Sequence, residues 1–174
     1  KLIRENSAAL AGTAFETGVA AVIRHAERAE MYLLKGRKDK DSDYFNDVIY
    51  RTNQAYEGML KESYALLAGK DGTKLRTAEL EKYFAEKKVL TTRVGEALQK
   101  YRQDWRNPST HDHRMQFSEQ DATLALSNVS TFVYLLVDQM IETSSSEKQK
   151  TLTTKGRHRK NIKTRGVSVG ERVT

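Results

Sequence analysis

The chain has 174 residues, of which 38% are hydrophobic and none is cysteine. This length suffices for one domain with a hydrophobic core, but not for two substantial ones. Without cysteine, a disulfide framework and a Cys-based zinc site are excluded, which favours a reducing, cytoplasmic location. The longest fully apolar run, 132–137, is far shorter than the roughly 20 residues of a membrane span, so no membrane association is expected. The start shows no signal-peptide pattern, and opening on Lys1 suits a piece of a longer protein.

The net charge of +7 belongs entirely to the C-terminal end. Basic and acidic residues balance over residues 1–142, whereas residues 143–174 contain nine basic and two acidic residues. Proteins that coat nucleic acid usually carry a broad basic face, so any RNA contact by the neutral body is expected to be local. The chain therefore divides into a body, 1–142, and a basic tail or linker, 143–174, which we expect to be ordered by a partner, by RNA phosphates or by packing in an oligomer.

Apolar residues at steps of three and four predict helices along most of the body. In chain order, the predicted helices cover about residues 8–35, 44–68, 77–88, 92–105 and 118–142. Ser118, with two acidic residues in the following turn, predicts the N-cap of the last helix. That helix is apolar on most sides and suits the bundle centre or a dimer interface. The prediction is an all-α antiparallel bundle of about five helices with a basic C-terminal extension, in which β-branched residues leave room for a small hairpin.

The stretch RNPSTHDH at 106–113 places a permanent cation before two histidines, at the only proline of the chain. Arg106 can hold a phosphate through two hydrogen bonds, and His111 or His113 can transfer a proton near neutral pH. Pro108 is expected to end the fourth helix, which puts Arg106 at a helix end. These residue types suit the cleavage of a phosphodiester without a metal or cofactor.

Arg106, Asn107 and His111 resemble the signature of the HEPN family of helical ribonucleases and toxins. That signature is Arg, a polar residue, a few variable positions and His, placed before the last long helix. His113 matches a variant of the signature with longer spacing, so the spacing does not decide which of the two histidines belongs to the motif. The resemblance covers roughly residues 8–142. It implies a metal-independent endoribonuclease of a toxin–antitoxin or anti-phage system, in which Arg106 and His111 are catalytic. Asn107 would orient Arg106 or cap a helix-end carbonyl, and it equally suits an ordinary turn before proline. The resemblance also implies an antitoxin or defence-complex partner.

Cleavage by the neighbouring 2′-hydroxyl needs a base, an acid and positive charge on the phosphate. One Arg and one His supply only part of that set. A symmetric dimer that pairs two copies of the motif supplies two of each, so we expect a homodimer acting on RNA with no cofactor and no metal.

Several of these residues also have a plainer interpretation. Arg106 could pair with an acid such as Asp104 or Asp112, leaving the histidines exposed in a polar turn. Arg102, on the same helix, could contact a second phosphate or be a solvated surface charge. Three tail residues are further candidates for RNA contact: Arg157, Arg159 and Lys160.

Other side chains carry weaker signals. Tyr101 and Trp105 could stack on a base, but their helical spacing suits core packing better. His25 suits the surface, and Glu57 with Lys61 forms an i, i+4 pair to which we assign no function. The alternative functions are a non-catalytic dimerisation or RNA-binding module, and a toxin masked by an antitoxin or nucleotidyltransferase partner.

Overall fold

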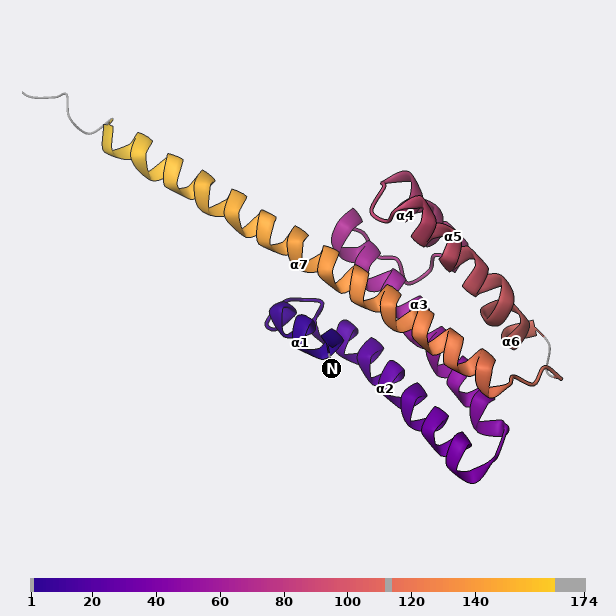
Figure 1. The fold of residues 1–174 in the computed structure, drawn as a ribbon. Helices are drawn as coiled ribbons and strands as arrows, with labels where there is room; N and C mark the ends of the chain where they lie inside the picture. The colour runs from indigo at the N-terminus through magenta and orange to yellow at the C-terminus, as the bar shows by residue number, and fades with distance from the viewer. Residues whose placement is uncertain (1, 112–113, 165–174) are drawn as a thin grey trace, which may run out of the picture. The chain divides into compact units, whose positions relative to one another are not determined.

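The computed structural model describes residues 2–111 and 114–164, and side chains from 4 to 146 apart from Asn6 and residues 110–113. These residues are helical throughout with short connections and no strand, which confirms the all-α prediction (Figure 1). The elements are α1 (Leu2–Ser7), η1 (Ala8–Leu10), α2 (Glu16–Asp39), α3 (Asp43–Ala68), α4 (Thr77–Glu86), α5 (Thr92–Tyr101), η2 (Arg102–Arg106), α6 (Asn107–His111) and α7 (Glu119–Thr164). They form two compact units, a body, Lys1–Met140, and a C-terminal unit, Ile141–Thr174.

Helices α2 and α3 form an antiparallel pair joined by a short turn. Lys40 ends α2 in the left-handed conformation, with φ of 55°, and the Asp41 N–H donates to the Gly36 carbonyl at 3.2 Å. Gly36 permits a close approach of the two helices, because a Cβ there would lie 2.7 Å from the Phe45 ring. Gly69, with φ of 63°, ends α3 where the sequence predicted its end.

The first predicted helix, 8–35, differs from the structure at both ends. Residues 8–10 form the short η1, a turn at Gly12 with φ of 74° follows, and α2 begins only at Glu16. At the other end α2 continues to Asp39, into the polar stretch GRKDKDSD at 36–43. Apolar periodicity marks only the buried part of a helix, and the Lys and Arg residues that extend α2 are good helix formers that need no burial.

Residues 119–140 of α7 lie at the centre of the body, which is one of the two placements that the sequence predicts. Ser118 is the predicted N-cap: its Oγ accepts the Asp121 N–H at 3.1 Å, and the Asp121 carboxylate accepts the Ser118 N–H at 3.0 Å. Eight apolar side chains of this segment are at most 2% exposed: Ala122, Ala125, Val129, Phe132, Val133, Leu136, Val137 and Met140. Residues 119–146 also contain an 18-residue window with a mean hydropathy of 1.4, which is long and apolar enough for a membrane span, but the central helix of a bundle has the same character.

The last helix is longer than predicted. It continues to Thr164 instead of ending near residue 142, so residues 151–164 are helical where a hairpin was considered. No glycine or proline interrupts residues 118–155, and the Ser146 hydroxyl donates to the Glu142 carbonyl at 2.9 Å within the helix. The side chains of Arg157, Arg159 and Lys160, and all of residues 165–174, lie outside the described part.

Candidate functional site

The backbone stays helical through Pro108, so the prediction that this proline ends the helix is wrong. Proline has no N–H, and inside an α-helix its ring clashes with the carbonyl four residues earlier. The chain instead makes one π-helical turn, η2, in which the Asn107 N–H donates to the Arg102 carbonyl five residues back. This wider turn lets the helix continue into α6. Single π turns are frequent at functional sites, and this one ends at Arg106.

Arg106 is held by a carboxylate of α3. Its Nε and Nη2 both donate to Oε1 of Glu57, at 2.8 and 2.5 Å, and each side chain is 25% exposed. The Thr77 hydroxyl donates to the same oxygen at 3.3 Å, and Oδ1 of Asn107 lies 3.5 Å from Nη1 of Arg106. Two donors on one oxygen fix the plane of the guanidinium, while its partial exposure leaves the group within reach of an anion.

This pairing corrects two expectations. Glu57 bonds to Arg106 across the bundle and is part of the site, whereas the sequence suggested only a surface pair with Lys61. Arg106 does pair with an acid, as in its plainer interpretation, but the acid is Glu57. Asp104 pairs with Lys100 at 2.8 Å, and Asp112 lies outside the described residues. The sequence gives only a partial indication of Glu57. This residue stands one turn after the buried Asn53 on the same face of α3, and the buried Tyr56 precedes it.

A second set of hydrogen bonds fastens α6 to α3. The Asn53 amide donates to the Ser109 hydroxyl at 2.7 Å, and that hydroxyl donates to the Arg106 carbonyl at 2.9 Å. The Tyr101 hydroxyl donates to Oδ1 of Asn53 at 2.6 Å. Burial raises the pKa of Tyr101, so the phenol remains a donor through the physiological range. The backbone and the side chain of Arg106 are therefore both fixed against α3.

Arg102 makes a second arginine–carboxylate pair one turn earlier. Its Nε donates to both oxygens of Glu81, at 3.1 and 2.9 Å, and the Tyr56 hydroxyl donates to Oε1. The side chains of Arg102 and Glu81 are 22% and 13% exposed, so Arg102 is not the solvated surface charge that was considered. Burial, with the Glu81 carboxylate nearby, raises the pKa of Tyr56. An RNA contact by Arg102 would have to compete with this pair.

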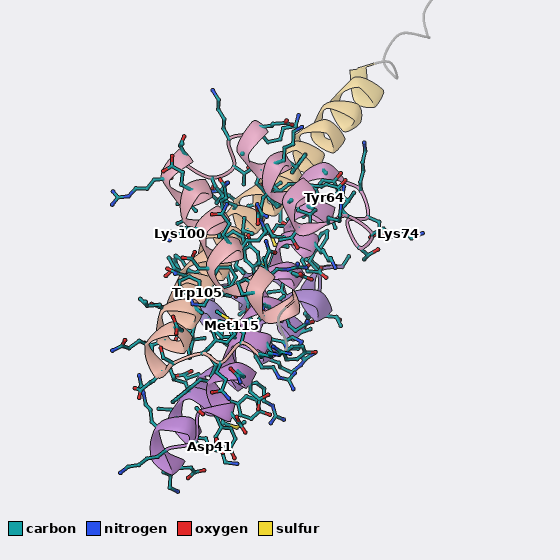
Figure 2. All side chains as sticks on the ribbon, turned by 90° about the vertical axis from the view of Figure 1, so that its right-hand side faces the viewer. Asp41, Tyr64, Lys74, Lys100, Trp105 and Met115 are labelled. Atoms are coloured by element: carbon teal, nitrogen blue, oxygen red, sulfur yellow. The ribbon has the colours of Figure 1, made fainter. Side chains whose placement is uncertain are left out.

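The aromatic residues of this segment pack in the core, as predicted. Tyr101 is 1% and Trp105 9% exposed, and their ring centroids lie 5.6 Å apart. Figure 2 shows Trp105 between Lys100 and Met115 on the side of the bundle that carries the motif. Neither ring presents a face for a nucleotide base.

The histidines lie at the edge of the described residues. His111 ends α6, but its side chain is outside the described part, as are Asp112 and His113 entirely. The structure thus places the backbone of His111 on the helix that directly follows Arg106. It gives no basis for choosing between the two histidines.

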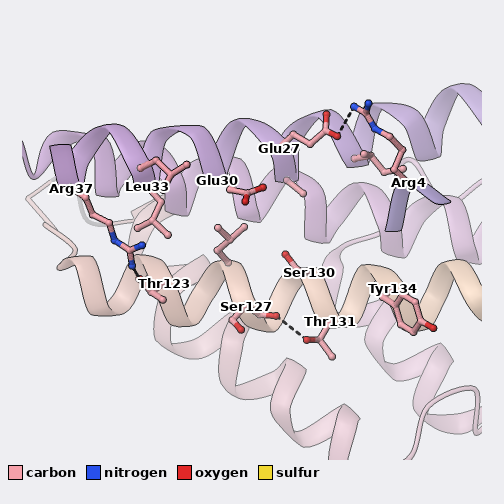
Figure 3. A pocket seen from close by; sticks show the side chains of 14 residues that line it. Arg4, Glu27, Glu30, Leu33, Arg37, Thr123, Ser127, Ser130, Thr131 and Tyr134 are labelled. Carbon is pink, nitrogen blue, oxygen red and sulfur yellow. Dashed lines mark hydrogen bonds and ion pairs between the residues drawn. The ribbon is translucent and has the colours of Figure 1, made fainter. Parts of the chain in front are cut away.

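A separate groove lies between α2 and the body segment of α7. Its volume is about 740 Å³, and Figure 3 shows Leu33 at its wall with the Arg4–Glu27 pair at one end and Arg37 at the other. Leu34, which also lines it, is 58% exposed. The lining is apolar with ionic ends, which suits a helix or another apolar surface better than a reaction centre.

No protein family, curated protein or solved structure matches the chain in sequence or structure comparisons. Function has to be inferred from the site itself. Among the described side chains, the Arg106 cluster combines a fixed cation, a carboxylate and several hydrogen-bond donors beside a histidine-bearing segment. Such a cluster can bind a phosphate and orient it for proton transfer.

Proposed function

We propose that the chain is a metal-independent endoribonuclease of the HEPN type, in which Arg106 and His111 act on RNA at a dimer-shared site. The observation that carries the proposal is the fixed Arg106 guanidinium on a π-helical turn, immediately before the helix that contains His111 and ahead of the long α7. This is where the HEPN signature belongs in an all-α bundle. The cytoplasmic, toxin–antitoxin or anti-phage setting is part of the proposal and rests on the resemblance alone.

In this mechanism a histidine takes the proton of the 2′-hydroxyl, whose oxygen attacks the adjacent phosphorus. The P–O5′ bond breaks, a second proton donor protonates the leaving oxygen, and the products are a 2′,3′-cyclic phosphate and a 5′-hydroxyl. Arg106 stabilises the negative charge that develops on the phosphate, and Glu57 keeps the guanidinium in place. In a dimer the second copy of His111 supplies the acid, and Asn107 orients the arginine.

The direct test is incubation of the purified chain with RNA in excess EDTA, followed by analysis of the new ends. Cleavage with 2′,3′-cyclic phosphate and 5′-hydroxyl ends is the expected result. A requirement for a divalent metal, or 5′-phosphate ends, contradicts the proposal. Sedimentation tests the shared site separately, because a stable monomer at micromolar concentration that still cuts RNA would exclude it.

The apolar groove between α2 and α7 favours a second candidate, a non-catalytic dimerisation module. An exposed leucine in a groove of this size is a surface that a second helix could cover. Replacing Leu34 with Glu separates the two candidates. Under the endoribonuclease proposal, Leu34→Glu leaves RNA cleavage intact. Under the alternative it dissociates the oligomer, and the wild-type chain cuts no RNA.

A further inference from the structure

The outer face of α2 and α3 carries a group of three arginines that, unlike five others in the body, form no ion pair among the described side chains. Arg24 and Arg28 are exposed and stand one turn apart on α2, and Arg51 lies opposite on α3. Five arginines of the body, Arg4, Arg37, Arg76, Arg102 and Arg106, each form an ion pair with a carboxylate. Among the described side chains, no carboxylate lies within ion-pair distance of Arg24, Arg28 or Arg51, although Asp47 stands one turn before Arg51. This face therefore holds uncompensated positive charge.

His25 shows that Arg51 and Arg24 lie close together. Its Nδ1 is 3.4 Å from Nη1 of Arg51, and the ring is partly buried between the two helices. Burial lowers the pKa of His25, and the charges of Arg51 and Arg24 lower it further. A histidine in this setting is neutral at physiological pH, so it fills space between the arginines without adding to their repulsion.

An exposed aromatic ring completes the group. Tyr50 is 55% exposed, and the guanidinium carbon of Arg51 lies 5.6 Å from the centroid of its ring. Tyr50 stands one turn before Asn53 and two turns before Glu57 on α3, which are the residues that hold Ser109 and Arg106. The basic strip, defined as Arg24, Arg28, Tyr50 and Arg51, thus runs from the edge of the candidate site across α3 to α2.

We propose that this basic strip binds the backbone of single-stranded RNA and leads it to the Arg106 site. Uncompensated arginines bind phosphates by releasing counterions, and an exposed ring stacks on a base whatever its identity. A row of cations with one aromatic platform suits a flexible single strand better than a duplex, whose bases are already stacked. The inference rests on the proposed function, because it takes the Arg106 site as the destination of the strand.

The test is binding of the full chain to a fluorescein-labelled 2′-O-methyl oligouridylate, which cannot be cut because it lacks the free 2′-hydroxyl. Affinity is measured by fluorescence anisotropy in EDTA over a range of salt concentrations. The charge variant is Arg24→Gln/Arg28→Gln, and its matched control is Lys70→Gln/Lys74→Gln, which removes the same charge from an exposed loop. The ring variant is Tyr50→Ala, with Tyr50→Phe as the version that retains the stacking face.

We expect the double arginine variant to bind about tenfold more weakly than the control variant, and the slope of log affinity against log salt to fall by about 1.4, roughly 0.7 for each lost phosphate contact. Tyr50→Ala should lose at least about fivefold, whereas Tyr50→Phe should bind as the wild type does. With cleavable RNA, the strip variants should raise KM and leave kcat unchanged.

Failure of the two proposals can be told apart. If the chain cuts RNA but the strip variants bind like the control, the strip is not the RNA path, while the proposed function stands. If the chain cuts no RNA yet the strip variants lose binding, the strip is a nucleic-acid surface and the proposed function fails. Displacement of the oligonucleotide by poly-glutamate at equal charge, with Tyr50→Ala binding normally, would identify a surface for an acidic protein segment and overturn the inference. No binding by the wild-type chain would overturn it as well.

Discussion

Two arginine–carboxylate pairs stand one turn apart on the same segment, and they differ in how completely the carboxylate is used. Glu81 engages Arg102 with both oxygens, accepts the Tyr56 hydroxyl as well, and is 13% exposed. Glu57 accepts both bonds from Arg106, and the bond from the Thr77 hydroxyl, on one oxygen, and the Arg106 and Glu57 side chains are 25% exposed. The two arginines are almost equally exposed, at 22% and 25%, so the pairs differ in the carboxylate and not in the cation. The first arrangement encloses the carboxylate, whereas the second orients a partly exposed cation on a carboxylate that water reaches more readily.

The largest expected effect follows from removing the Arg106 cation. Arg106→Ala should lower the rate of RNA cleavage by roughly 10²–10³, because a preorganised electrostatic donor is lost from the transition state. His111→Ala should lower it by roughly 10²–10⁴ as a proton-transfer group, and His113→Ala should do less if the shorter spacing is catalytic. Rates are measured under single-turnover conditions in EDTA, and circular dichroism verifies folding. Wild-type rates in folded Arg106→Ala and His111→Ala proteins would disprove the assignment.

Removing the cation of the Arg102–Glu81 pair should instead lower the stability of the protein. Arg102→Ala leaves the Glu81 carboxylate without its cation in a largely buried position, which should cost about 1–3 kcal/mol of unfolding free energy. Urea denaturation of Arg102→Ala and Arg106→Ala measures the difference, and Arg106→Ala should lose less because water can reach Glu57 more readily. If Arg106→Ala proves the less stable of the two, the contrast between the pairs is wrong.

The carboxylate of the Arg106–Glu57 pair should affect catalysis through the arginine. Glu57→Gln preserves the shape of the side chain but removes the charge that fixes the guanidinium. We expect kcat to fall on the order of tenfold through imprecise positioning, whereas KM should not rise, because the loss of a negative charge does not oppose phosphate binding. Glu81→Gln is the matched control and should leave kcat near wild type. Equal kcat values for Glu57→Gln and wild type would mean that Glu57 is only structural.

Much of the fold could be predicted from the sequence, because the buried face of a helix requires apolar residues at every third or fourth position. The stripe of α7, the core positions of Tyr101 and Trp105, and the Ser118 cap were all predicted and found. The ends of α2 and α7 were not, since exposed helix formers such as the Lys and Arg residues after Leu33 carry no such period. The same limitation hid the continuation of the helix through Pro108, because a π turn depends on the geometry of the backbone and has no signature in residue type.

Only those residues of the candidate site that are neighbours in the sequence were predicted. Arg106 and Asn107 adjoin in the chain, so a motif could identify them, and their contact is present. Glu57 is 49 residues from its partner, and Glu81 is 21 from Arg102. Pairing at such distances depends on which turns of α3, α4 and η2 face one another, and a single sequence does not specify this. Of the two acids that the neighbouring sequence offered for Arg106, Asp104 bonds to Lys100 one turn earlier, and Asp112 lies outside the described residues.

Glu62 extends the comparison to a carboxylate that has no ion pair among the described side chains, and it should give the smallest effect. It lies against Gly18 of α2, where a Cβ would approach its carboxyl group to 2.1 Å, and burial raises its pKa. A raised pKa means that the native state prefers the protonated form. The contribution of Glu62 to stability is therefore fully present below the ordinary glutamate pKa and is lost as the pH rises through the native value.

Glu62→Gln should consequently stabilise the protein near neutral pH, by at most about 0.5 kcal/mol because the group is partly open to water. The gain should disappear at about pH 3.5, where wild type and variant are both uncharged at this position. Thermal denaturation of both proteins at the two pH values measures this, and a variant that is less stable at neutral pH would show that the ionised Glu62 has a favourable partner.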